Sequence, residues 1–140
     1  MSYGSNSARY LENEILSRSP EWLVPLLYEH LIKNLSRASV HIDDGNLEGK
    51  AFSLGLANQI VMELLNSLDH ERGGDIADRL ASLYAFLSSE IITVGRTLDT
   101  AYLQRLIALV SELHEAWVQA AEQVAPRGRS STVAVRAAVA

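Results

Sequence analysis

Three absences narrow the classes of protein to which this chain of 140 residues can belong. It has no cysteine, which excludes disulfides, thiolate metal sites and cysteine nucleophiles and is typical of a reducing compartment. The first ten residues, MSYGSNSARY, lack the basic region and apolar run of a secretory signal. No apolar stretch approaches the roughly 20 residues of a membrane span. We therefore expect neither secretion nor insertion into a membrane.

Strand signals and a basic surface are also missing. The chain shows no alternating apolar runs and no Asn-Gly hairpins, so the pattern predicts an all-α protein. The formal net charge is −5, and residues 126–140 contribute +3 through their arginines without an acid, which leaves −8 for the rest of the chain. Because contacts with phosphates dominate affinity for nucleic acids, so acidic a body predicts no nucleic-acid partner.

Helical periodicity occurs four times along the chain, in stretches of roughly 20–25 residues. Three short breaks separate these stretches: DDGN at 43–46, RGGD at 72–75 and GRTLD at 95–99. Short links between long amphipathic helices force neighbouring helices to run antiparallel. The sequence therefore predicts one domain over residues 19–125, an antiparallel up-down-up-down four-helix bundle.

Residues that favour helix ends mark the expected boundaries. Ser19 is suited to cap the first helix, and Pro20 suits its first position because the missing N–H has no partner there. Gly45 can adopt the left-handed conformation that ends this helix. Asn46 and Asp99 can cap the second and fourth helices with their side chains.

Two prolines and the two ends of the chain complete the expected organisation. Pro25 lies one turn inside the first helix and predicts either a kink or a tight first turn over residues 20–24. Pro126 is expected to end the fourth helix. Residues 1–18 form a short apolar segment that we expect to cap the bundle. Residues 126–140 have no partner stripe and are expected to form a disordered tail.

The apolar arcs of two helices are wider than a bundle core requires. A core-facing helix needs an apolar arc a little over about 100° wide, whereas the second and fourth helices spread theirs over roughly 180° and roughly 160°. A tail, a second copy or another protein could cover the surplus. Scattered exposed apolar residues are the ordinary alternative. The surplus favours a groove that accepts amphipathic helices.

The chain offers no set of residues that predicts an enzyme. No Glu is followed three residues later by His, as a carboxylate-bridged di-metal site in a four-helix bundle requires. RGGD joins two helices and lacks the strand and the lysine of a phosphate-binding loop. His41 near Asp43 and Asp44 is a weak metal signal. We expect no catalysis, no metal and no cofactor.

One alternative function stays open, that of a histidine phosphotransfer domain. Such domains use an exposed helical His with a Lys three residues later, and His30 and Lys33 have this spacing. Asn34, however, stands where such domains usually have glycine. A surface histidine is the simpler interpretation of His30. We expect His114 to be half-buried on the fourth helix and His70 to contact the dipole at the end of the second.

Four segments of the chain, taken together and in order, resemble the flagellar secretion chaperone family FliS. The resemblance extends from about Tyr10 to Val124. Its segments are YLENEILSRSPEWLVPLLYEHLI (10–32), IVMELLNSLDHERGGDIADRLASLYAFL (60–87), the Asp99 helix start and LHEAW (113–117).

This resemblance implies a cytoplasmic chaperone that binds the disordered C-terminal region of flagellin. Such a protein holds the flagellin subunit as a monomer, blocks premature filament assembly and aids delivery to the flagellar export gate, without ATP. In the family the flagellin segment wraps around the bundle as short helices joined by extended stretches. We expect the chaperone itself to be a monomer; a structural bundle that dimerises through its wide apolar face is the remaining alternative.

The expected partner site consists of apolar residues on the outer arcs of the second and third helices. These residues are Leu56, Ile60, Leu64, Phe86 and Ile92. Two residues of the N-terminal segment, Tyr10 and Ile15, are expected to join them, because that segment is apolar enough to cover part of the site in the free protein. The resemblance implies that it moves when flagellin binds. A fixed N-terminal staple is the alternative.

Overall fold

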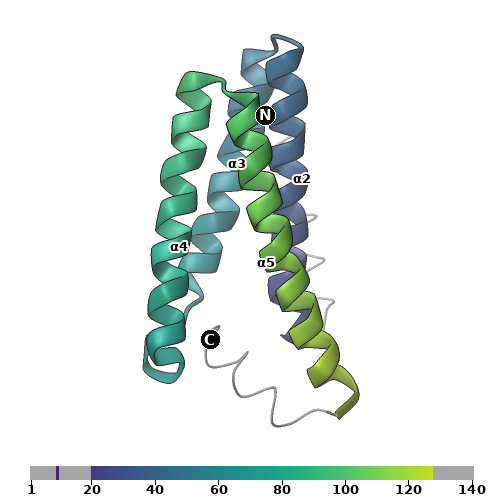
Figure 1. Cartoon of the computed structure of the whole chain (residues 1–140), viewed down its shortest axis with the longest axis vertical. Helices are drawn as coiled ribbons and strands as arrows, with labels where there is room; N and C mark the ends of the chain where they lie inside the picture. The colour runs from purple at the N-terminus through teal and green to yellow at the C-terminus, as the bar shows by residue number, and fades with distance from the viewer. Residues whose placement is uncertain (1–8, 10–19, 128–140) are drawn as a thin grey trace.

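The computed structural model describes Arg9 and residues 20–127, and within them the protein is all-α. A short 3-10 turn, η1 (Pro20–Trp22), leads into four helices. These are α2 (Leu23–Asp43), α3 (Leu47–Asn66), α4 (His70–Thr97) and α5 (Thr100–Arg127) (Figure 1). The predicted all-α four-helix fold is confirmed.

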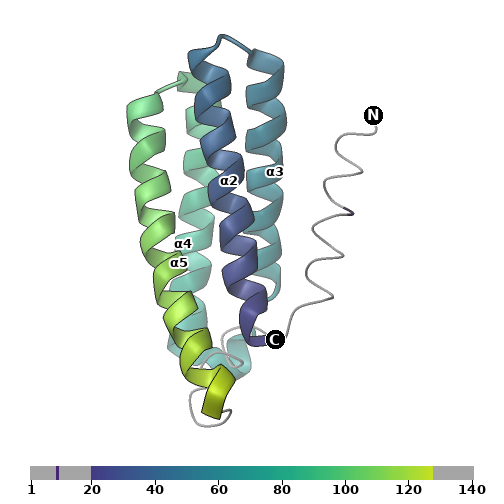
Figure 2. The same ribbon diagram turned by 90° about the vertical axis from the view of Figure 1, so that its right-hand side faces the viewer.

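The helices run up and down in turn, and each packs beside its neighbours in the chain (Figure 2). Helix α2 packs most extensively, against α3 on one side and α5 on the other, and α3 also packs against α4. Among adjacent helices, α4 and α5 approach each other over the fewest residues. Figure 1 shows their axes diverging from the connection between them toward the end where α4 begins and α5 ends.

Three of the predicted helix ends are confirmed in detail. Gly45 adopts a φ of 71°, which ends α2 in the left-handed region that glycine tolerates. The Asn46 side chain accepts a hydrogen bond from the Gly49 N–H at 2.9 Å at the start of α3. The Asp99 side chain accepts one from the Tyr102 N–H at 3.0 Å at the start of α5. The fourth helix ends at Arg127, one residue beyond the expected Pro126.

The predicted break at RGGD is partly right: the backbone is non-helical at Gly74, but α3 already ends at Asn66 and α4 begins at His70. Asp69 starts α4 by accepting a hydrogen bond from the Arg72 N–H at 3.1 Å. Gly74 then interrupts the helix with φ 50° and ψ −126°. Gly74 thus makes a kink inside α4, while the Asp69 cap begins the helix.

The expectation for His70 is wrong for the same reason. Its ring lies at the N-terminal end of α4 and not at the C-terminal end of the preceding helix. The His70 Nδ1 lies 3.1 Å from the Asp78 carboxylate, across the kink at Gly74. A local contact with an acid therefore replaces the expected contact with a helix dipole.

Pro25 is accommodated by a tight first turn, one of its two predicted outcomes. The 3-10 turn occupies residues 20–22, and Pro25 is the third residue of α2 and is buried. N–H groups in the first turn of a helix lack intrahelical acceptors, so the proline removes no ladder hydrogen bond there. Ser19, the expected cap, lies outside the described residues, as do the segments 1–8, 10–18 and 128–140.

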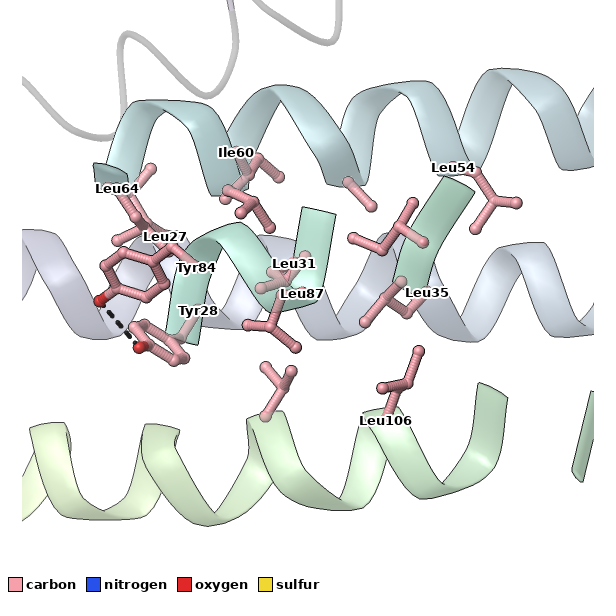
Figure 3. Packing of buried hydrophobic residues seen from close by; sticks show 14 of the residues in the cluster. Leu27, Tyr28, Leu31, Leu35, Leu54, Ile60, Leu64, Tyr84, Leu87 and Leu106 are labelled. Atoms are coloured by element: carbon pink, nitrogen blue, oxygen red, sulfur yellow. Dashed lines mark hydrogen bonds between the residues drawn. The ribbon is translucent and has the colours of Figure 1, made fainter. Parts of the chain in front are cut away.

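The core forms a continuous row of leucine, valine, isoleucine and tyrosine side chains between the helices (Figure 3). Most of the periodic apolar residues contribute to it, but Leu47 and Ile76 are more than half exposed. Leu47 is the first residue of α3, and Ile76 lies two residues after the kink at Gly74, so each lies at the start of a regular helical stretch. Ala57, Ala77, Tyr28 and Tyr84 are also buried.

Candidate functional site

A pair of buried tyrosines ties three helices together at the centre of the bundle. The hydroxyls of Tyr28 in α2 and Tyr84 in α4 hydrogen bond at 2.9 Å, and Figure 3 shows the two side chains meeting at their hydroxyl ends. The ring of Trp117 in α5 lies with its centroid 6.5 Å from that of Tyr28. Burial raises the pKa of both tyrosines, so both hydroxyls stay protonated at neutral pH. This pair holds the bundle together and offers no reactive group.

The described residues contain no group of three or more His, Cys, Asp or Glu side chains that could hold a metal ion. His41 contacts the Asn46 side chain, with 3.4 Å between Nδ1 and Nδ2. His114 is half-buried, as expected, and its Nε2 lies 3.7 Å from a carboxylate oxygen of Glu29. His30 is half-buried on α2, beside the exposed Lys33.

The structure places two of the expected site residues in the core. Ile60 and Leu64 are 5% and 1% exposed and pack with the other buried apolar residues. Leu56 is half-buried and lies one turn before Ile60. Asn58, which contacts α4, is about 160° around the axis of α3 from Leu56. Leu56 therefore lies on the flank of α3 away from α4. The side chains of Ile60 and Leu64 are covered by the core. Their role in binding a partner stays a prediction.

The two remaining described residues, Phe86 and Ile92, lie on opposite flanks of α4. Phe86 is 45% exposed and Ile92 is 60% exposed. Ile92 follows Ser88 by one turn, and the Ser88 hydroxyl donates a hydrogen bond to Asn58 of α3 at 2.6 Å, so Ile92 is on the side of α3. Phe86 precedes Glu90 by one turn, and Glu90 accepts a hydrogen bond from Tyr102 of α5.

The expected residues thus do not form one continuous patch. Those of α3 are divided between the core and one flank, and those of α4 lie on two flanks. Tyr10 and Ile15 fall outside the described residues. Periodicity missed one exposed residue that belongs with Leu56, namely Phe52. Its spacing of four residues before Leu56 was the available signal, because residues four apart share a helix face.

A further set of apolar residues lies along the weakly packed junction of α4 and α5. Glu90 of α4 and Tyr102 of α5 contact each other, so they mark the sides on which the two helices face. Residues seven positions apart lie on nearly the same side of a helix, so steps of seven, backward from Glu90 and forward from Tyr102, follow these facing sides. These steps reach residues that are half-buried or exposed. We define them, with their neighbours one turn away, as the α4–α5 face: Ile76, Leu83, Phe86, Leu109, Leu113 and Ala116.

One end of the α4–α5 face is closed by polar contacts. The Tyr102 hydroxyl donates a hydrogen bond to the Glu90 carboxylate, which raises the pKa of Tyr102. The Arg105 guanidinium lies 5.4 Å from the centroid of the Tyr102 ring. These contacts lie near the connection at residues 98–99. The face is therefore held together at that end and widens toward the end where Arg127 leaves the bundle (Figure 1).

None of the described helices is long and apolar enough to cross a membrane. The surface carries apolar side chains on several helix flanks, around a core of buried residues. Such a surface is suited to binding another apolar segment. Segments that present an apolar side to such flanks are the chemically matched ligands.

Comparisons with known proteins find relatives over most of the chain. A family model described as flagellar protein FliS matches residues 3–124. The flagellar secretion chaperone FliS of Vibrio cholerae is 29% identical over 124 residues, which cover 89% of this chain and 88% of that protein. The FliS chaperone of Salmonella typhimurium is 29% identical over 110 residues (78% and 82% of the two chains). That of Bacillus subtilis is 24% identical over 111 residues (79% and 82%). Because the family model covers nearly the whole helical body, this chain belongs to the FliS family.

Proposed function

We propose that this protein is a cytoplasmic export chaperone that binds the disordered C-terminal region of flagellin. By covering that region it keeps flagellin from polymerising prematurely, and it accompanies the subunit to the flagellar type III export apparatus. Membership of a family whose relatives are named flagellar secretion chaperones supports the export role. The choice of flagellin as the partner rests on that family and on the apolar surface of the bundle.

The observation that carries the proposal is the presence of large apolar side chains on the flanks of a well-packed bundle. Phe52 and Leu56 lie on α3, and Phe86 and Ile92 lie on the two flanks of α4. Each flank carries one or two large apolar side chains, and one binding segment can cover several such flanks at once. Several separate strips suit a long segment that crosses the bundle more than once and places a short helix on each strip.

The mechanism that we propose is coupled folding and binding. A disordered segment loses conformational entropy when it becomes ordered, and the burial of apolar surface on both partners offsets this loss. The net affinity therefore stays low enough for release at the export apparatus. The proposal requires no nucleotide, because mass action on the coupled folding and binding equilibrium is sufficient. The acidic surface can guide basic groups of the partner toward the bundle, with a range limited to about 8 Å at physiological salt.

Removal of the C-terminal region of flagellin is expected to abolish the complex. In a calorimetric titration with this protein, full-length flagellin should bind, and flagellin lacking its C-terminal helices should bind at least about 100-fold more weakly, equivalent to about 2.7 kcal/mol. A flagellin lacking the corresponding length of its N-terminal region is the matched control and should bind as the full-length protein does. Equal binding of the two truncated flagellins would contradict the proposal.

The N-terminal segment is expected to compete with the partner. We propose that residues 8–18, with Tyr10 and Ile15, cover part of the binding surface in the free protein. Deleting residues 1–18 should then raise the affinity for flagellin, by roughly tenfold if only about a tenth of the molecules have the surface open. Amide exchange of residues 8–18 should become faster when flagellin is added. Unchanged exchange together with unchanged affinity would identify the segment as a fixed staple.

A further inference from the structure

Residues 128–140 follow α5 directly, and the α4–α5 face of the same bundle lies within their reach. We propose that residues 128–140, which the sequence alone predicts to be a disordered tail, dock on the α4–α5 face, so that the chain supplies its own occupant for the apolar surface between the two diverging helices. The inference concerns contact within one chain and does not depend on which partner the bundle binds.

The place where α5 ends supports this docking. Helix α5 runs to Arg127, and the antiparallel α4 begins at His70, so both lie at the widening end of the face (Figure 1). The opposite end is closed by the hydrogen bond between Tyr102 and Glu90. A chain that leaves α5 and turns back meets Ile76 of α4 first, which is 55% exposed, and then Ala116 and Phe86.

The length of the segment matches the length of the face. Turning back from Arg127 to the level of Leu109 means retracing 18 residues of α5, about 27 Å at 1.5 Å per residue. The 13 residues 128–140 span about 20 Å as a helix and up to about 43 Å when extended. Either conformation therefore covers most or all of the face.

The chemistry of the segment also matches the face. Its second half, VAVRAAVA, is made of small apolar residues around a single arginine. Small side chains allow close approach to Ala116 and fill the space beside Phe86 and Leu113 without a bulky anchor. The segment carries positive charge and no acid, whereas exposed acids border the face, Asp75 next to Ile76 and Glu112 one turn before Ala116. Arg79, one turn after Ile76, is also exposed, so the charges are complementary beside Asp75 and Glu112 and not along the whole face.

Connection within one chain makes even a weak contact effective. A short flexible linker holds the segment near the face at an effective concentration on the order of millimolar. If the segment bound the face with a dissociation constant of about 1 mM, the face would therefore be occupied in half of the molecules. The match to the FliS family model ends at residue 124, before this segment. Docking of residues 128–140 would thus add a feature to the bundle without altering the family's common body.

The absence of cysteine from the chain permits a direct test by disulfide trapping. One variant carries Ala116→Cys together with Ala137→Cys, which places a thiol on the face and one on the segment. The control carries Ala85→Cys with Ala137→Cys. Ala85 is exposed, as Ala116 is. The two lie at a similar height along the bundle, since Ala85 is 13 residues before Leu98 and Ala116 is 17 residues after Asp99. Ala85, however, is on the flank of α4 toward α3.

Both full-length proteins are oxidised mildly at two protein concentrations, and the disulfides are located by peptide mass mapping. Docking predicts an intrachain disulfide at position 116 that forms at least about fivefold faster than the one at position 85, at both concentrations. Adding Val135→Asp and Val139→Asp, which removes the apolar contact, should abolish this difference. Equal rates at positions 116 and 85 would overturn the proposal, and so would disulfides formed mainly between two chains.

Discussion

Replacing Ile60 with aspartate is expected to lower the free energy of unfolding by about 3–5 kcal/mol, because a carboxylate replaces a branched side chain that packs in the core. That is a large part of the roughly 5–15 kcal/mol by which a domain is stable. Denaturant unfolding followed by circular dichroism measures the change. The outer-arc interpretation of the sequence would predict nearly unchanged stability at this position, so the measurement separates core from surface.

Phe86→Asp is the matched surface substitution and should give the opposite pattern. Because Phe86 is 45% exposed, its replacement should change the stability by no more than about 1 kcal/mol. If the α4–α5 face binds flagellin, affinity should fall by about 10- to 100-fold, as expected for loss of an aromatic contact. Ser89→Asp adds the same charge to an exposed position of α4 and should change neither quantity. Wild-type stability of Ile60→Asp, or wild-type affinity of Phe86→Asp, would refute the respective assignment.

Replacing Tyr84 with alanine is expected to be the second large perturbation. Removal of a buried aromatic ring costs about 3–5 kcal/mol. The substitution also leaves the Tyr28 hydroxyl, 2.9 Å away in the native protein, without this partner in the interior. The loss should therefore reach the upper end of this range and loosen the packing between α2 and α4.

Tyr84→Phe separates the ring from its hydroxyl. It keeps the packing and removes only the hydrogen bond, so it should cost about 1–3 kcal/mol, the penalty for leaving a buried polar group unsatisfied. The double variant with Tyr28→Phe removes both hydroxyls and should recover part of that loss. Fluorescence of Trp117, which lies against Tyr28, reports the local packing beside the unfolding curves. Equal stability of the phenylalanine and alanine variants would show that the ring contributes nothing.

The sequence by itself determined the fold class, the number of helices and most helix ends. These features depend on local chemistry: the periodicity of apolar residues along one helix, the left-handed Gly45 and the side-chain caps Asn46 and Asp99. Family membership also followed from the sequence, because it depends on the order and spacing of residue types. The one misplaced boundary arose where two signals compete. Asp69 caps α4. A glycine such as Gly74 is compatible with a loop between helices and with a kink inside one helix, and in the structure it forms the kink.

Only the tertiary structure decided how each helix is rotated about its axis. An apolar arc of roughly 180° on α3 is compatible with several rotations, since each one still buries an apolar face. Packing against α2 and α4 selects the rotation that buries Ile60 and Leu64 and leaves Phe52 and Leu47 outside. The same long-range packing places Phe86 and Ile92 on opposite flanks of α4 and pairs Tyr28 with Tyr84, 56 residues apart. Such contacts depend on helices meeting in space, and no local periodicity contains that information.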